Sequence, residues 1–243
     1  MSEAADHPAP RRRRTQAERS TATRARILTA TADCLLERGH QATTISEVQQ
    51  RTGLARGTIQ HHFPTRADLL VAALSHLVDV RIAQFRAESA RISPGADRMH
   101  AVVDLILRDL TSPIFFAALE LWVAARTDAD LRRALLPEEA RLFAALHSLY
   151  RETLGEPYAS DERVETLVEF TVDLVTGLTM TTMLTGDDGR RQAVARRWKR
   201  ALTILIGSAP ASDLLTGRPL DQPASTDPGP AVQPGTRSGR VDP

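Results

Sequence analysis

Four side chains suited to reading DNA lie close together between residues 55 and 63, namely Arg56, Thr58, Gln60 and His61. If this segment is a short helix, the apolar Leu54, Ile59 and Phe63 are buried on one side of it and the four polar side chains point outward. Guanidinium and amide groups can make paired hydrogen bonds to base edges in the major groove, and hydroxyl and imidazole groups can bind bases or phosphates. The residue types and their spacing therefore predict a DNA-reading helix.

A second short helix is predicted just before it. Thr44 and Glu47 have the spacing of a capping box, in which each side chain bonds the backbone N–H of the other residue. Ile45 and Val48 give this helix a buried edge, and Gly53 stands where a helix ends in a left-handed residue. The two helices would form a helix-turn-helix. An ordinary pair of helices with a solvated polar face is the alternative.

The positions that decide between these alternatives are Ile27, Leu28, Gly39, Thr43, Thr44, Thr52, Gly53, Leu54, Arg56, Gly57, Thr58, His62, Phe63, Pro64, Asp68, Leu69 and Leu70. At this spacing, the stretch 24–70 resembles the DNA-binding domain of the TetR family of bacterial regulators. The resemblance implies a homodimer on a double-stranded DNA operator with a palindromic sequence. Arg56, Thr58, Gln60 and His61 are expected to face the major groove, with Thr44 and Arg66 on phosphates, and Gly57 is expected within the same DNA-binding surface.

Three positions depart from the family pattern. Gln49 stands where a small alanine usually lets the two helices approach, so its amide must reach solvent to avoid the cost of unpaired burial. Gln60 replaces a tyrosine that usually contacts the DNA backbone, and Arg66 replaces a lysine. These changes leave the DNA-binding interpretation intact, but the operator of a relative cannot be transferred to this chain.

Charge and composition agree with this interpretation. Residues 1–70 carry 11 arginines and 7 acidic residues, a net charge of +4, whereas the whole chain is only +1. Positive charge therefore accompanies the helix-turn-helix, as phosphate binding requires. Cys34 is the only cysteine, which excludes an intramolecular disulfide and suggests a small buried core residue. There is no apolar run of membrane-spanning length and no secretory signal pattern, so a cytoplasmic protein without membrane contact is expected.

Catalysis is not expected. The sequence has no Gly-rich phosphate loop, no HExxH or CxxC spacing and no nucleophile elbow. Its seven histidines are scattered without cysteine or carboxylate partners at ligand spacing. We therefore predict no catalytic residue, no metal site and no cofactor.

Apolar residues recur at three- and four-residue spacing throughout, which predicts an all-α fold. Helices are expected at 15–38, 65–92, 96–110, 113–126, 130–154, 161–185 and 188–207, with Pro113 and Pro137 in first turns and Gly155 and Gly186 at ends. The predicted organisation is a disordered basic arm (1–14), a three-helix DNA-binding domain (15–65), a helical ligand-binding and dimerisation domain (66–208) and a disordered tail (209–243). The arginines at 11–14 are either solvated or lie along DNA.

The segment 113–126 is apolar on nearly every face, which predicts a buried helix with Glu120 in its middle. A structural ion pair, with Arg126 or another arginine, is the common explanation of such a carboxylate. The functional alternative is a polar anchor in an apolar ligand pocket. The candidate ligand-binding residues are Phe116, Glu120, Trp122, Phe143 and Tyr150, with Phe115 as a further wall residue. His100 and His147 are expected to be partly exposed or hydrogen-bonded.

The last two helices have wide apolar faces formed by Leu167, Phe170, Leu174, Leu178, Met180 and Thr181 and by Val194, Trp198, Ala201, Leu202, Leu205 and Ile206. In the TetR family such helices pair with those of a second subunit, although they could equally close an intramolecular core. The function that we predict is a DNA-binding regulator, most simply a repressor released by a small apolar or amphipathic inducer. The alternatives are a helical protein-interaction module and a regulator without an inducer pocket.

Overall fold

The computed structural model describes residues 15–93, 98–156 and 158–208, and these ranges contain helices, turns and no strand. The α-helices are α1 (Gln16–Ala42), α2 (Ile45–Thr52), α3 (Arg56–His62), α4 (Arg66–Ser89), α5 (Arg98–Asp109), α6 (Pro113–Ala125), α7 (Ala129–Leu154), α8 (Arg163–Thr182) and α9 (Asp188–Ser208), with one 3-10 turn (Tyr158–Ser160) before α8. The all-α prediction is confirmed. The predicted arm and tail lie outside the described residues.

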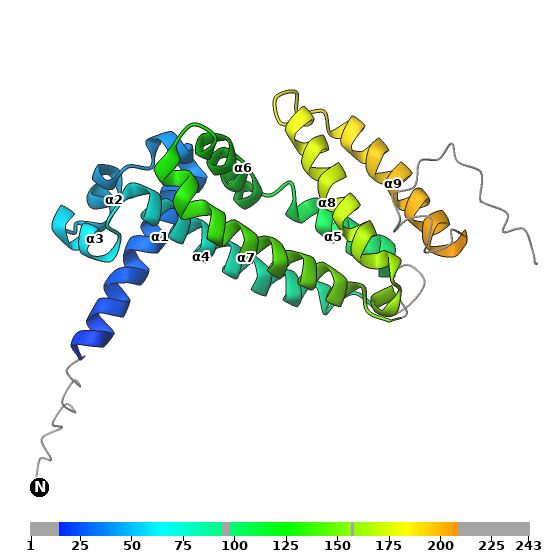
Figure 1. Ribbon diagram of the computed structural model, residues 1–243, viewed down its shortest axis with the longest axis horizontal. Coiled ribbons are helices and arrows are strands. Elements are labelled where there is room, and N and C mark those ends of the chain that lie inside the picture. Colours follow the sequence, from blue (N-terminus) through cyan, green and yellow to red (C-terminus); the bar gives the residue numbers. More distant parts are fainter. Residues whose placement is uncertain (1–14, 94–97, 157, 209–243) are drawn as a thin grey trace, which may run out of the picture.

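The molecule is elongated, with the helix-turn-helix at one end and the α8–α9 hairpin at the other (Figure 1). The long helices α4 and α7 run side by side between these ends. Helix α4 also packs on α1, so one continuous rod extends from the back of the helix-turn-helix to the C-terminal helices. None of the described helices is long and apolar enough to cross a membrane.

Capping residues set several of the helix starts. Thr65 and Asp68 form a complete capping box at α4, with side chain and backbone bonded in both directions. At α2 only half of the predicted box exists, because Thr44 accepts the N–H of Glu47 but the Glu47 carboxylate does not return to Thr44. That carboxylate instead pairs with Arg38 at 2.8 Å and Arg51 at 3.0 Å. Competition from two arginines explains why the reciprocal box is not formed.

Two helix positions differ from the sequence prediction. Helix α1 continues past residue 38 to Ala42, with a break at Gly39, whose φ of 75° and ψ of 178° are not helical. Pro137 lies inside α7, which begins at Ala129, and is not in its first turn as predicted. A proline there removes one backbone N–H from the helix, yet the apolar pattern on both sides of it holds α7 against α4.

The core divides into three clusters along the rod. The first joins α1 to the helix-turn-helix through Ile27, Leu28, Val48, Ile59, Phe63, Leu69 and Ala73. The second lies where α1, α4, α6 and α7 meet, and the third is formed by α5, α7, α8 and α9 with Phe85 of α4. Cys34 is fully buried, so its prediction as a core residue is confirmed.

Helix α6 is only partly buried, which corrects the expectation from its composition. Ala117, Leu119 and Leu121 face the interior, but Val123 is 59% exposed and Trp122 is 37% exposed. Glu120 is also exposed, so the prediction of a carboxylate buried within this helix is wrong. An apolar helix can therefore present an open face, and this face borders the cavity described below.

Candidate DNA-binding surface and ligand cavity

Helix α3 is anchored from beneath and open above. Ile59 and Phe63 are buried in the cluster that joins the helix-turn-helix to α1 and α4. The outward side consists of the exposed Arg56, Gly57, Gln60 and His61, with Thr58 half-buried. Gly53 ends α2 with a φ of 64°, as predicted, and this left-handed residue turns the chain into α3. The structure thus brings the predicted base-reading residues together on one free helix face.

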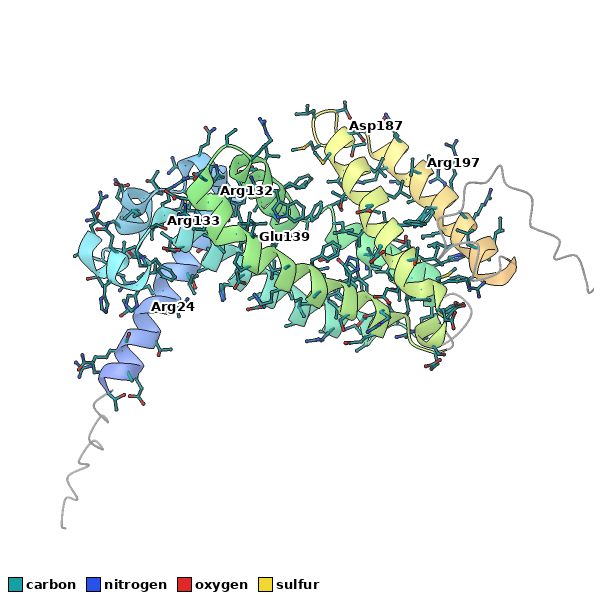
Figure 2. All side chains as sticks on the ribbon, in the orientation of Figure 1. Arg24, Arg132, Arg133, Glu139, Asp187 and Arg197 are labelled. Atoms are coloured by element: carbon teal, nitrogen blue, oxygen red, sulfur yellow. The ribbon has the colours of Figure 1, made fainter. Side chains whose placement is uncertain are left out.

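Two arginines of α1 fasten the helix-turn-helix from behind. The Arg26 guanidinium donates to the carbonyl oxygen of Thr52, at the last residue of α2. The Arg24 guanidinium lies over the Phe63 ring, 4.9 Å from its centroid. Figure 2 shows Arg24 on the stretch of α1 that extends past the helix-turn-helix. Gln49 is half-buried in α2, consistent with an amide that reaches the surface.

Arg66 holds the α1–α2 junction. Its Nε donates to the carbonyl oxygen of Thr43 at 2.9 Å, and a terminal nitrogen donates to the carbonyl oxygen of His40. Burial lowers the pKa of this guanidinium. The sequence does not indicate this structural role, and the phosphate contact of Arg66 stays a prediction. Thr44 remains exposed beside this junction as the N-cap of α2.

Glu120 contacts the same junction from the other side. Its carboxylate accepts the backbone N–H of His40 at 2.7 Å and lies against Gly39, where an added Cβ would be 2.9 Å from Oε2. The predicted ion pair with Arg126 is not among the described contacts, and Glu120 does not line the cavity between α4, α6, α7 and α8. Because the partner is a backbone group 80 residues away, no local sequence signal indicates this contact. It joins α6 directly to the end of α1.

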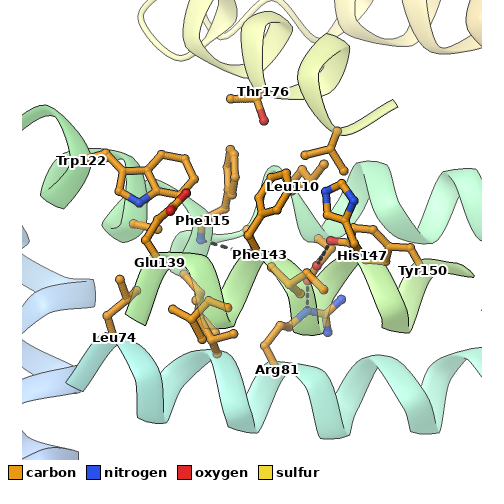
Figure 3. A pocket seen from close by; sticks show the side chains of 18 of the residues that line it. Leu74, Arg81, Leu110, Phe115, Trp122, Glu139, Phe143, His147, Tyr150 and Thr176 are labelled. Atoms are coloured by element: carbon orange, nitrogen blue, oxygen red, sulfur yellow. Dashed lines mark hydrogen bonds and ion pairs between the residues drawn. The ribbon is translucent and has the colours of Figure 1, made fainter. Parts of the chain in front are cut away.

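A cavity of about 230 Å³ lies between α4, α6, α7 and α8 (Figure 3). Of the predicted ligand-binding residues, Trp122, Phe143 and Tyr150 line this cavity, and Phe116 and Glu120 do not. Phe115 lines it, with its ring edge-on to Trp122 at a centroid distance of 6.1 Å. Further walls come from Leu74, Val78, Leu110, Ala118, Leu135, Leu142, Leu146 and Val172.

Sequence reasoning missed most of these walls, although α7 carried a signal for them. Glu139, Leu142, Phe143, Leu146, His147 and Tyr150 recur at three- and four-residue spacing, so they share one face of that helix. That spacing predicts a common face but not whether it is filled or hollow. Phe116, one residue from Phe115, points elsewhere because neighbouring helical positions lie about 100° apart.

A buried polar cluster closes one end of the cavity. Asp109 accepts the Tyr150 hydroxyl at 2.6 Å and forms an ion pair with Arg81, which also bonds Glu88 at 2.9 Å. Asp109 and Tyr150 are buried, and this burial together with the Asp109 charge raises the pKa of Tyr150 well above its ordinary value. The members of this cluster are bonded to one another, so their charges are largely balanced before any ligand enters.

His147 lies on the same wall with an unused nitrogen. Its Nε2 is buried and has no hydrogen-bond partner among the described residues, and its ring packs on Phe143 at 3.9 Å. Burial lowers the pKa of His147, although carboxylates on α8, including Asp173, oppose this effect. His147 is half-buried, which agrees with the expectation of a partly exposed or hydrogen-bonded histidine, although this nitrogen has no partner among the described residues. His100, in contrast, is within 3.1 Å of the Thr203 hydroxyl.

The predicted dimer-forming faces are divided by the structure. Leu167, Leu178 and Leu202 are buried within the subunit, so they belong to its own core. The apolar residues left exposed on or beside α8 and α9 are Phe170, Leu174, Met180, Met183, Leu184 and Ile204. Figure 2 shows Asp187 at the tip of this hairpin and Arg197 along α9. Among the residues described, no three His, Cys, Asp or Glu side chains converge to hold a metal ion.

Comparison with known proteins agrees with this arrangement. The sequence profile of bacterial regulatory proteins of the tetR family matches residues 27–73, which include α2, α3 and the start of α4. The chain is 28% identical over 183 residues to the HTH-type transcriptional regulator CymR of Pseudomonas putida, covering 75% of this chain and 90% of that protein.

Two solved structures show the same fold at low identity. A TetR transcription regulator from Haloarcula marismortui is 16% identical with a TM-score of 0.55, covering 74% of this chain and 96% of that chain. The transcriptional regulator FadR from Bacillus subtilis, in complex with stearoyl-CoA, is 15% identical with a TM-score of 0.53, covering 76% and 99%. Residues 27–73 are thus a DNA-binding domain of the tetR family of bacterial regulatory proteins, and the chain as a whole is similar to HTH-type transcriptional regulators.

Proposed function

We propose that this regulator is a repressor that binds a palindromic operator as a homodimer and is released by a small molecule. The observation that carries the release step is the cavity between α4, α6, α7 and α8, because a concave space lined mainly by apolar and aromatic side chains with a few polar groups is the usual form of a small-molecule site. The complex of FadR with stearoyl-CoA supports small-molecule binding within this fold. A helical interaction module without a DNA role is disfavoured by the open polar face of α3.

DNA selection followed by titration tests the proposal. Fragments selected from random duplex by the purified chain should share a palindrome, and fluorescence anisotropy should give tight binding that weakens steeply with salt. Operator fused to a reporter should be silenced when the chain is present, which tests the sign of regulation. Binding that is equally weak on selected and random duplexes would refute the assignment of a specific operator.

Arg56 is our proposed base reader on α3. Arg56→Ala should weaken binding to the selected operator by about 1–3 kcal/mol and relax preference at one base pair of each half-site. Arg151→Ala is the matched control, because it removes an exposed arginine from α7 at the end remote from α3. Anisotropy titrations on operator and random duplex measure both. If Arg56→Ala lowers the affinity for all DNA sequences equally, Arg56 contacts phosphates rather than bases.

The exposed apolar face of α8 and α9 is the proposed dimer interface. Leu174 is 37% exposed and Ile204 is 63% exposed, so charging them should leave the subunit core intact. We expect the Leu174→Arg, Ile204→Arg double variant to sediment as a monomer at micromolar concentration and to lose operator binding, because one α3 reads too few base pairs. Leu136→Arg on α7, where the leucine is 56% exposed, is the control that should remain dimeric. A monomeric parent protein would contradict this assignment.

Helix α6 supplies a route from the cavity to the DNA-binding domain. Phe115, Ala118 and Trp122 of α6 line the cavity, while Glu120 bonds the backbone of His40 at the end of α1. A ligand that moves α6 would therefore move the junction that leads into α2. A second route runs through α4, because α4 lines the same cavity with Leu74 and Val78 and packs on α1. A hundredfold release requires a coupling free energy of about 2.7 kcal/mol between ligand and operator.

A further inference from the structure

The charge balance of the cavity wall distinguishes the ligands that it can accept. Two carboxylates line the cavity from facing helices, the half-buried Glu139 of α7 and the exposed Asp173 of α8. Neither is paired with a cationic side chain in the part of the chain that the structure describes. The arginine of the lining, Arg81, is already balanced by Asp109 and Glu88. The wall therefore carries excess negative charge.

Aromatic rings stand next to these carboxylates. Trp122 and Phe115 project from α6 and Phe143 projects from α7, and in Figure 3 the Glu139 side chain lies beside the Trp122 ring. The faces of such rings attract cations, most strongly for tryptophan. A positive group entering here would meet a carboxylate and a ring face together, whereas an anion would meet unpaired carboxylates.

The rest of the lining is apolar and the space is small. Leu74, Val78, Leu135 and Leu142 form the wall on the α4 and α7 side. The volume of about 230 Å³ is below the ~300–1,000 Å³ of pockets that hold drug-sized ligands. The buried Nε2 of His147, still without a partner, adds one site for a hydrogen bond at the inner end. The cavity thus suits a compact, mainly apolar ligand that carries no more than one polar group at each end.

We propose that the cavity binds a small organic cation, an ammonium or amidinium group on a compact apolar or aromatic body. The charged end lies against Glu139 and the Trp122 ring, with Asp173 contributing negative charge from the α8 wall, and the apolar end packs against Leu74 and Val78. This inference rests on the proposed ligand-binding role of the cavity and specifies the class of ligand. Glu139 and Asp173 replace Glu120 as the groups that hold the polar end, since Glu120 is engaged with His40 outside the cavity.

Three probes with one carbon skeleton and three charges test the proposal by isothermal titration calorimetry on the full chain. These are 3-phenylpropan-1-amine, 3-phenylpropan-1-ol and 3-phenylpropanoate, which are cationic, neutral and anionic at neutral pH. We expect the amine to bind at least about tenfold more tightly than the alcohol, and the carboxylate to bind most weakly. Glu139→Gln and Asp173→Asn should each lower amine affinity by about three- to tenfold and leave alcohol affinity unchanged.

Glu162→Gln is the matched control, because it removes an exposed carboxylate from the start of α8 that makes no side-chain cap. It should leave all three affinities unchanged. The proposal would be overturned if the alcohol or the carboxylate bound as tightly as the amine or more tightly, or if none of the probes gave heat. It would also be overturned if neither cavity variant changed the affinity for the amine. Calorimetry measures ligand binding without DNA, so a separate operator titration distinguishes failure of the proposed function from failure of the proposed ligand class. If the amine binds but does not release the operator, ligand-controlled release is refuted. If only 3-phenylpropanoate releases the operator, the proposal of a cationic ligand is refuted.

Discussion

Replacing Asp109 by alanine is expected to lower the free energy of unfolding by about 2–4 kcal/mol. The substitution removes the counter-charge of Arg81 and the acceptor of the Tyr150 hydroxyl in one step. Breaking a buried ion pair from one side leaves the other charge uncompensated, which costs more than the pair itself contributes. The remaining bond from Arg81 to Glu88 limits the loss. Urea denaturation followed by circular dichroism, at one fixed protein concentration, measures the effect.

Two control variants distinguish the loss of stability from this buried cluster from the effect of removing a charge anywhere in the protein. Asp130→Ala removes a surface pair with Arg133, whose side chains are both mostly exposed, and should cost below about 1 kcal/mol. Changing both Arg81 and Asp109 to leucine should cost less than Asp109→Ala alone, because no buried charge is then left without a partner. Equal losses from Asp109→Ala and Asp130→Ala would show that the cluster does not stabilise the fold.

Gly39→Ala is expected to destabilise the fold by about 2–4 kcal/mol. Its φ of 75° with a ψ of 178° belongs to a region that only glycine adopts without strain. The new Cβ would also stand 2.9 Å from the Glu120 carboxylate, which must turn away and lose its bond to the N–H of His40. Thermal and urea unfolding should both report the loss.

Gly57→Ala is the natural comparison, since this glycine is helical and an added Cβ meets nothing within 4 Å. It should raise the free energy of unfolding by about 0.5–1 kcal/mol, because alanine favours the helix. Combining Gly39→Ala with Glu120→Ala removes the crowding and keeps the backbone strain, so the difference between the single and double variants isolates the contact. A harmless Gly39→Ala would contradict the non-helical geometry at this residue.

The structural features that the sequence predicts correctly are those determined by residues close to one another in the chain. The turn at Gly53 and the burial of Ile59 and Phe63 beneath α3 are set by residues within a few positions, and the structure confirms them. Residue roles that depend on distant partners were not predictable. Arg66 binds two carbonyl groups of the α1–α2 junction, and Glu120 binds the N–H of His40, because the tertiary fold brings these elements together.

The cavity illustrates a second limit. The apolar spacing on α7 predicts which side chains face inward, but hollow and filled interiors have the same pattern. Trp122, Phe143 and Tyr150 were predicted as aromatic wall residues and line the space, whereas Phe116 does not. The difference is set by the rotation of α6 about its axis, and that rotation follows from packing on α1, α4 and α7 together.

The bond from Glu120 to the main chain of His40 has a consequence for comparing sequences of relatives. A side chain that binds a backbone amide places no demand on the side chain of its partner, so position 40 is free to vary while the contact persists. Substitutions at 120 and 40 would then show no correlated change, and methods that detect contacts from paired substitutions would overlook the link. The constraint falls instead on the neighbouring Gly39, where a larger residue would crowd the carboxylate. The proposed route from the cavity to the DNA-binding domain would then be recorded in an alignment only as an invariant glycine.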